Sequence, residues 1–164
     1  MSEMTHHPLL FTLRDAVSGK GFLAGITLSG RALMVQEDGK WWTYGVRPGA
    51  IAESGSTPQE SFARFRNRYK EVLFDIADES RTFAAFKREV ERFANEVDKE
   101  EERSWNDALQ LVRASSGPPP EPFSQLDRMK AEEAPPKVTV EKLSAAKRKF
   151  TPKDNLKDTV AKAA

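Results

Sequence analysis

Carboxylates are the most plentiful side chains that could do chemistry in this sequence, because it contains no cysteine and only two histidines. A two-metal nuclease would need Asp38, Glu53 and Asp75 to converge on a divalent ion. Asp38 instead precedes a glycine in a turn signal, and the spacing of the three residues does not enforce convergence. We therefore expect no catalytic residue, no metal ligand and no cofactor, and keep a metal-dependent nuclease only as the less favoured alternative.

The two histidines, His6 and His7, are adjacent near the start of the chain. Neighbouring side chains on an extended chain point to opposite sides, so this pair makes a poor joint metal site and a poor general base. We expect residues 1–7 to form a flexible, solvated N-terminus.

Charge is abundant but balanced, with 26 lysines and arginines against 25 aspartates and glutamates. No global field therefore draws the chain to nucleic acid or to an anionic membrane. The basic residues from Arg64 to Lys70 fall on two helix faces beside acidic neighbours, which favours a solvated face over a nucleic-acid site in the core domain. Because no signal peptide or membrane-spanning apolar run is present, we expect a cytoplasmic protein without a membrane partner.

Aromatic residues after the same turn signal favour binding over catalysis. On a strand, Trp41 points to one side of the sheet, whereas Trp42 and Tyr44 point to the other. One large aromatic side chain must then lie on the face away from a packed helix, beside basic residues, which suits a protein interface. The candidate partner-binding residues are Lys40, Trp41, Trp42, Tyr44, Arg47 and Phe74.

The segment Ala32–Ala77 supplies the elements that position these residues. Ala32–Glu37 and Trp41–Val46 are β-prone runs separated by Asp38-Gly39, which tolerates the positive φ angles of a hairpin turn. A further turn and a short third run follow and end at Gly55.

Earlier in the chain, Pro8–Val17 and Phe22–Leu28 show the alternation of strands. The pair Ser29-Gly30 is predicted to turn the chain toward Ala32. We expect a sheet of three to five strands, antiparallel because the connections are too short for crossovers.

A helix is predicted from Thr57 to about Glu79, because Thr57-Pro58-Gln59-Glu60 combines a cap, a proline at the first helical position and a capping-box glutamate. Its apolar residues share one face at three- and four-residue steps, as in a helix lying on a sheet. Phe74 lies off that stripe and needs a different partner, either the next helix or another protein chain.

Two further helical pieces, 81–99 and 100–113, extend this domain. Apolar residues of the first piece are spaced 3, 4, 3, 4, which is an a/d seam. A helix packed within the chain gives the same spacing as a short coiled coil. Intramolecular packing is favoured, and homo-oligomerisation is the alternative.

Composition changes at Ser116, after which seven of the ten prolines lie and large apolar residues are few. Such a segment cannot bury enough surface to offset the entropy of ordering. We expect residues 116–164 to form a largely disordered tail, in which Val138–Val140 and Lys142–Phe150 order only against a partner. The expected fold is therefore an α+β domain over residues 8–115.

The central stretch, about residues 32–79, resembles the antitoxin family HicB. Proteins of that family have a partial RNase H-like domain, in which a small antiparallel sheet is followed by a helix. The matching features are the hairpin Glu37-Asp38-Gly39, the strand Trp41–Val46, the turn Arg47-Pro48-Gly49, the strand end Glu53-Ser54-Gly55 and the helix opening Thr57–Glu60.

The resemblance implies a non-enzymatic protein that binds and inhibits a small RNA-cleaving toxin, usually as an oligomer. Family members often carry a C-terminal operator-binding domain, and residues 116–164 lack the periodicity and the glycine-marked turn for one. The first alternative is a HicB-like homo-oligomeric interaction protein without a toxin.

Overall fold

The computed structural model describes residues 6–115, 117–143 and 158–164. Within these ranges the fold is α+β, with three α-helices and a mixed sheet of seven strands, so the α+β prediction is confirmed and the sheet is larger than expected. The strands are β1 (His6–Gly19), β2 (Phe22–Glu37), β3 (Lys40–Arg47), β4 (Ala52–Gly55), β5 (Asp127–Met129), β6 (Lys137–Leu143) and β7 (Thr159–Ala163). The helices are α1 (Pro58–Glu79), α2 (Phe83–Ala94) and α3 (Lys99–Ala114), and two short 3-10 turns cover Phe123–Gln125 and Ala131–Glu133.

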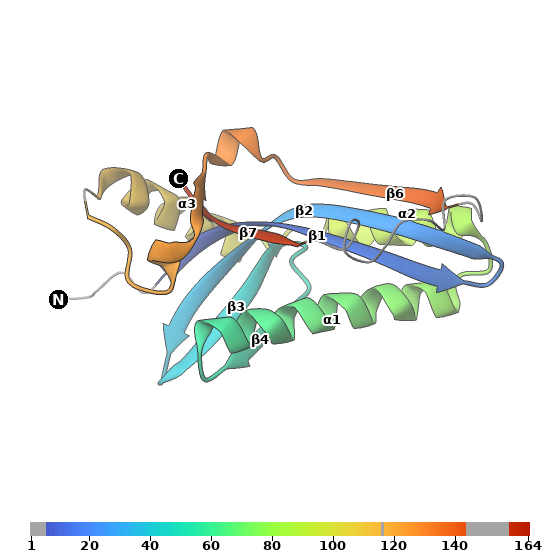
Figure 1. Cartoon of the computed structure of the whole chain (residues 1–164), viewed down its shortest axis with the longest axis horizontal. Helices are drawn as coiled ribbons and strands as arrows, with labels where there is room; N and C mark the ends of the chain where they lie inside the picture. The colour runs from blue at the N-terminus through green and yellow to red at the C-terminus, as the bar shows by residue number, and fades with distance from the viewer. Residues whose placement is uncertain (1–5, 116, 144–157) are drawn as a thin grey trace.

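A long hairpin of β1 and β2 forms the centre of the sheet (Figure 1). The strand order is β4-β3-β2-β1-β7-β5. The second half of β2 pairs with β3, and the first half pairs with β6, which runs alongside it in Figure 1. The single strand β2 therefore carries two different neighbours on the same edge.

The continuity of β2 corrects the turn predicted at Ser29-Gly30. Both residues lie within the strand, where Ser29 pairs with Thr12 and Gly30 with Phe11 of β1. A Cβ atom on Gly30 would stand 2.6 Å from Cζ of Phe11 and 2.5 Å from the carbonyl oxygen of Arg47. The absence of a side chain at Gly30 therefore lets Phe11 and the Arg47 carbonyl approach the strand closely. In the sequence alone, a glycine with this role cannot be told from a glycine in a turn.

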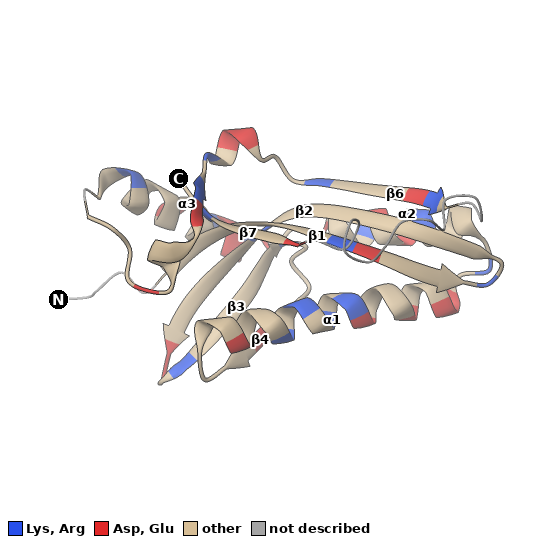
Figure 2. Cartoon of the chain, in the orientation of Figure 1, with Lys and Arg blue, Asp and Glu red and all other residues tan. Residues whose placement is uncertain are grey.

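Helix α1 begins and ends as predicted. The Thr57 hydroxyl accepts a hydrogen bond from the Glu60 amide at 3.0 Å, and the Glu60 carboxylate accepts one from the Ser56 amide at 3.1 Å. Residues of both charge signs are spread along the helix (Figure 2). The Phe74 side chain lies off the buried stripe and is 46% exposed.

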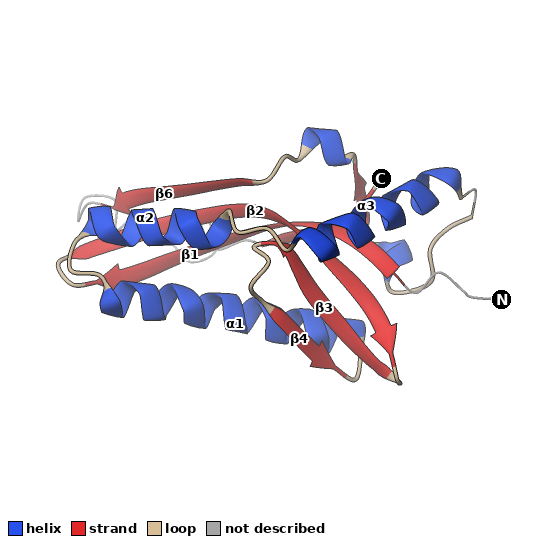
Figure 3. Cartoon of the chain, turned by 180° about the vertical axis from the view of Figure 1, so that it is seen from behind, coloured by secondary structure: helices blue, strands red, loops and turns tan. Residues whose placement is uncertain are grey.

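Two helices lie on one face of the sheet and one helix packs on the other. Phe11 and Ile26 belong to the core shared with α1 and α2, which lie together in front of the β1–β2 hairpin in Figure 3. Successive side chains of a strand point to opposite faces, so Leu10 of β1 and Leu33 of β2 lie on the other face of the sheet. There they pack with Trp105 of α3. The sheet therefore has a core on each face.

The predicted a/d seam packs against the sheet of its own chain. Phe86 and Val90 of α2 are fully buried in the core that also contains Val140 of β6. The helix ends at Ala94, earlier than predicted. The connection to α3 is hydrogen-bonded to the end of β3, where the Asp98 amide donates to the Val46 carbonyl at 3.1 Å.

The C-terminal region corrects the prediction of a largely disordered tail. Strands β5, β6 and β7 all belong to the sheet, so the sheet extends beyond the predicted boundary at residue 115. Their partners are distant in sequence: β6 pairs with β2, β7 pairs antiparallel with β1, and β5 pairs with β7 in parallel, unlike the expected antiparallel sheet. Within Lys142–Phe150, residues 144–150 lie outside the described residues.

Among the described residues, each helix is too short or too polar to cross a membrane.

Candidate functional site

The β2–β3 hairpin positions the predicted aromatic residues. Asp38 and Gly39 have φ angles of 51° and 77°, so this turn adopts the left-handed geometry expected from its sequence. The register places Trp42 opposite Val35 and Tyr44 opposite Leu33. Since Val35 and Leu33 face α3, both aromatic side chains lie on that face of the sheet.

Trp42 and Tyr44 form a stacked pair. Their ring centroids are 5.7 Å apart with an interplanar angle of 12°, and both side chains are half-buried. The Tyr44 hydroxyl donates to the Glu37 carboxylate, with both oxygens at 3.4 Å. Stacking and this hydrogen bond restrict the rotamers of the pair before any partner binds.

Acidic groups surround this aromatic pair. Burial, with smaller effects from Glu37 and Glu101, raises the pKa of the Tyr44 hydroxyl. Burial likewise raises the pKa of Glu101, in the first turn of α3, and Asp98, Glu100 and Glu37 add to that rise. Glu37, Lys40, Trp42, Tyr44 and Glu101 are named here the Trp42–Tyr44 surface. Its charge is predominantly negative, and Figure 2 shows charges of both signs at the tip of the hairpin.

A short edge strand borders this surface. In β4, Ser54 pairs with Trp42 and Ala52 pairs with Tyr44. The Ser54 carbonyl already accepts a hydrogen bond from Arg64 of α1 at 3.1 Å. This carbonyl group of the edge strand is therefore already occupied within the chain.

Trp41 points to the other face, as its position in the strand predicts, and is covered by the chain itself. Its ring centroid lies 5.8 Å from that of Phe123 and 6.0 Å from that of His7. Phe123 comes from the C-terminal region that was expected to be disordered. Trp41 is therefore half-buried in an internal aromatic cluster and separated from Trp42 by the sheet.

The remaining predicted residues are not brought together. Lys40 is exposed opposite Glu37 in the hairpin. Arg47 donates from Nη2 to the Asn95 side chain at 2.6 Å, at the far end of β3. Phe74 lies on α1, beyond the opposite face of the sheet from Trp42.

At His7 the structure corrects the prediction of a solvated N-terminus over residues 1–7, of which residues 1–5 lie outside the described residues. Residues His6 and His7 open β1, and His7 is 5% exposed, with its ring stacked on Phe123 at a centroid distance of 3.9 Å. Burial, assisted by the nearby His6, lowers the pKa of His7 to about 4. Leu9 and Phe11 alternate along the strand and share its buried face, and the same alternation places His7 on that face. This pattern was the sequence signal that could have predicted the burial of His7.

The acidic candidates are dispersed over three elements. Asp38 is in the β2–β3 turn, Glu53 is on β4 and Asp75 is exposed on α1. Within residues 6–115, 117–143 and 158–164, no group of three or more His, Asp or Glu side chains is placed to hold a metal ion.

Comparisons with protein-family models, with curated proteins and with solved structures find no match for this chain.

Proposed function

We propose that this chain is a non-enzymatic protein-binding module of the antitoxin type, which sequesters a small RNA-cleaving toxin through the Trp42–Tyr44 surface. The observation that carries the proposal is the stacked, half-buried Trp42–Tyr44 pair on the face of the sheet opposite α1. Tryptophan and tyrosine offer a large contact area at a low cost in side-chain entropy, and they are enriched among residues that dominate binding energy.

The charge around the pair supports a basic partner. Burial is the main cause of the raised pKa of the Tyr44 hydroxyl, and the nearby carboxylates of Glu37 and Glu101 raise it further. Complementary charge accelerates encounter and selects against wrong partners, while a cationic side chain also interacts favourably with an aromatic face. A small RNA-binding toxin with a basic surface fits this combination.

Growth on co-expression tests this proposal. The product of a short reading frame adjoining the gene, encoding a small basic protein, is induced with and without this chain. We expect the wild-type chain to restore growth and the double variant Trp42→Ala, Tyr44→Ala to fail. Leu111→Ala is the matched control, because Leu111 is an apolar residue of α3 with 56% exposure. Absence of such a neighbour, or equal rescue by the double variant, refutes the proposal.

Homo-oligomerisation is the second candidate, and Phe74 favours it. This large apolar side chain of α1 is 46% exposed, and a second copy of the chain would cover it. Light scattering of the purified protein should show a dimer or larger species that Phe74→Ser converts to a monomer. A strictly monomeric wild-type chain rules this candidate out.

A further inference from the structure

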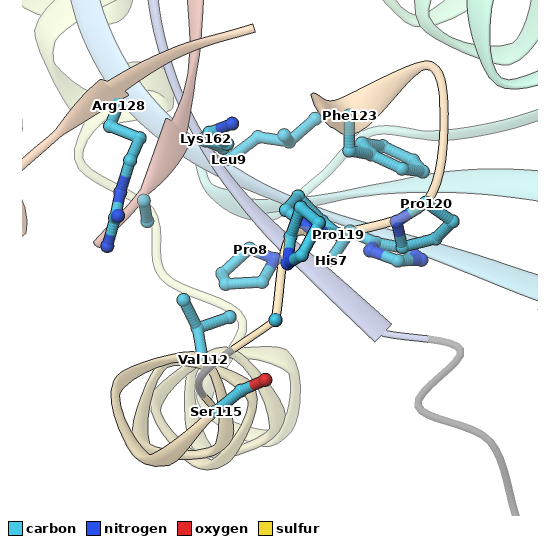
Figure 4. A pocket seen from close by; sticks show the side chains of 13 residues that line it. His7, Pro8, Leu9, Val112, Ser115, Pro119, Pro120, Phe123, Arg128 and Lys162 are labelled. Carbon is cyan, nitrogen blue, oxygen red and sulfur yellow. The ribbon is translucent and has the colours of Figure 1, made fainter. Parts of the chain in front are cut away.

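A cavity of about 710 Å³ lies where the start of β1, the end of α3, the segment 117–122 and strands β5 and β7 meet (Figure 4). This volume is in the range of small-molecule sites. The residues that line the cavity are His7, Pro8, Leu9, Val112, Ser115, Gly117, Pro118, Pro119, Pro120, Phe123, Arg128, Lys162 and Ala163.

The wall of the cavity is mostly apolar and stiff. Four of its residues are prolines, whose φ angles are restricted by their rings. Leu9, Val112 and Phe123 add aliphatic and aromatic surface. In Figure 4 the side chains of Pro8 and Pro119 lie between the end of α3 and the strands. Such a wall suits a ring or a short hydrocarbon chain, and little conformational entropy would be lost on binding.

Two of the four polar side chains that line the cavity, Arg128 and Lys162, are cationic. Arg128 of β5 and Lys162 of β7 are register partners in the parallel pair, so they project from the same face of the sheet. Lys162 donates a hydrogen bond to the Ser124 carbonyl at 3.3 Å, which holds its ammonium group at this end of the strand. Within the described part of the chain, aspartate and glutamate are absent from the lining.

The other polar groups are uncharged at neutral pH. Ser115 supplies a hydroxyl group at the end of α3. His7 is neutral because burial lowers its pKa to about 4, and its ring is fixed against Phe123. The cavity therefore combines two cationic side chains from register-paired positions with neutral hydrogen-bonding groups and an apolar wall.

We propose that this cavity binds a small organic anion with an apolar body, specifically an aromatic or short-chain carboxylate. Its carboxylate interacts with Arg128 and Lys162, and its body lies against Pro8, Pro119 and Val112. This site shares no residue with the Trp42–Tyr44 surface, so the proposal for the cavity is independent of the proposed protein partner.

Three probes that share the same ring and have a similar size test the proposal: naphthalene-2-carboxylate, its neutral amide and the cationic 2-naphthylmethylammonium. Titration calorimetry of the full chain should give saturable binding of the carboxylate, at least about tenfold tighter than the amide, and no binding of the cation. The selectivity follows from charge-assisted hydrogen bonds that only the anion accepts.

Variants locate the binding site. Arg128→Gln with Lys162→Gln should weaken carboxylate binding by about tenfold or more and remove the preference over the amide. Val112→Trp fills the cavity and should abolish binding of both probes, whereas Arg103→Gln, an exposed position on α3, should change nothing. Circular dichroism confirms that each variant is folded. Absence of saturable binding to the wild-type chain at millimolar carboxylate, equal affinity for acid and amide, or unchanged affinity in the double variant overturns the proposal.

Discussion

Arg66 of α1 donates two hydrogen bonds to Asp15 of β1, from Nη1 and Nη2 to the two carboxylate oxygens, each at 3.0 Å. Its Nε also donates to Asp158, just before β7, at 2.8 Å. The Asp15 side chain is only 3% exposed and that of Arg66 17%. The sequence predicts Arg66 on a solvated helix face. In the structure it links α1 to β1 through Asp15 and to Asp158, the residue before β7.

Removal of the Asp15 carboxylate should destabilise the fold. In Asp15→Ala the Arg66 guanidinium keeps Asp158 but loses its buried partner, and we expect the free energy of unfolding to fall by about 2–3 kcal/mol. Urea denaturation followed by circular dichroism measures this loss. The control is Arg68→Ala, which removes an exposed pair with Glu71 and should cost under about 0.5 kcal/mol. Equal effects of the two substitutions would show that the Arg66 network is not stabilising.

Two glycines of β2 should respond differently to alanine. Gly30→Ala introduces a methyl group 2.5 Å from the Arg47 carbonyl, so we expect a loss of several kcal/mol or failure to fold. Gly25→Ala places its methyl group 3.5 Å from the flexible Leu143 side chain, and should be neutral or stabilising by up to about 1 kcal/mol. Thermal unfolding compares them. A well-tolerated alanine at Gly30 would contradict the close approach of Phe11 and the Arg47 carbonyl to this position.

Acidification should lower the free energy of unfolding, because the buried His7 resists protonation in the folded chain. The pKa of His7 is about 4 in the folded chain, lowered by burial from 6.5, so the unfolded chain binds the extra proton between these values. This group therefore destabilises the fold as pH falls from 6.5 to 4, by about 2–3 kcal/mol in total, and has no effect above pH 6.5.

The substitution His7→Phe isolates this contribution. It keeps a ring against Phe123 but removes the titrating group, so the free energy of unfolding should vary less between pH 6.5 and 4 than in the wild-type chain. His6→Phe, at an exposed position, is the control and should retain most of the wild-type pH dependence, because burial contributes more than His6 to the lowered pKa of His7. Identical curves for all three proteins would mean that His7 is accessible to solvent.

Phe123→Ala tests whether the C-terminal region packs on the sheet. Phe123 is 2% exposed and covers both Trp41 and His7, so its truncation should cost about 3–4 kcal/mol. It should also expose the His7 ring and raise the pKa of His7 toward 6.5, which an NMR titration of the imidazole resonances detects. Unchanged stability together with an unchanged His7 pKa would contradict this packing.

The elements that could be predicted from the sequence are those with local causes. The cap formed by Thr57 and Glu60, the hairpin turn at Asp38-Gly39 and the opposite directions of Trp41 and Trp42 each depend on residues within a few positions of one another. A helix cap, a hairpin turn and a strand pleat involve only backbone groups that are close in the sequence, so nearby residues are sufficient to predict them.

The features that could not be predicted depend on distant partners. Gly30 resembles a turn residue until Phe11 is placed beside it. His7 resembles a solvated terminal residue until Phe123 stacks on it, more than a hundred positions later. The run around Val140 is too short and too polar to order alone, and its partner is β2 of the same chain. The low hydrophobicity of this run therefore indicated disorder, although pairing with β2 buries part of it in the folded chain.

The dissociation constant of the complex between this chain and the small basic product of an adjoining reading frame measures the role of the Trp42–Tyr44 surface most directly. We predict binding by the wild-type chain and an increase in Kd of at least about 100-fold for Trp42→Ala with Tyr44→Ala, since central aromatic residues commonly contribute 2 kcal/mol or more each. Leu111→Ala should leave the Kd unchanged. A Kd that is the same for the wild-type chain and the double variant would contradict the proposed binding surface.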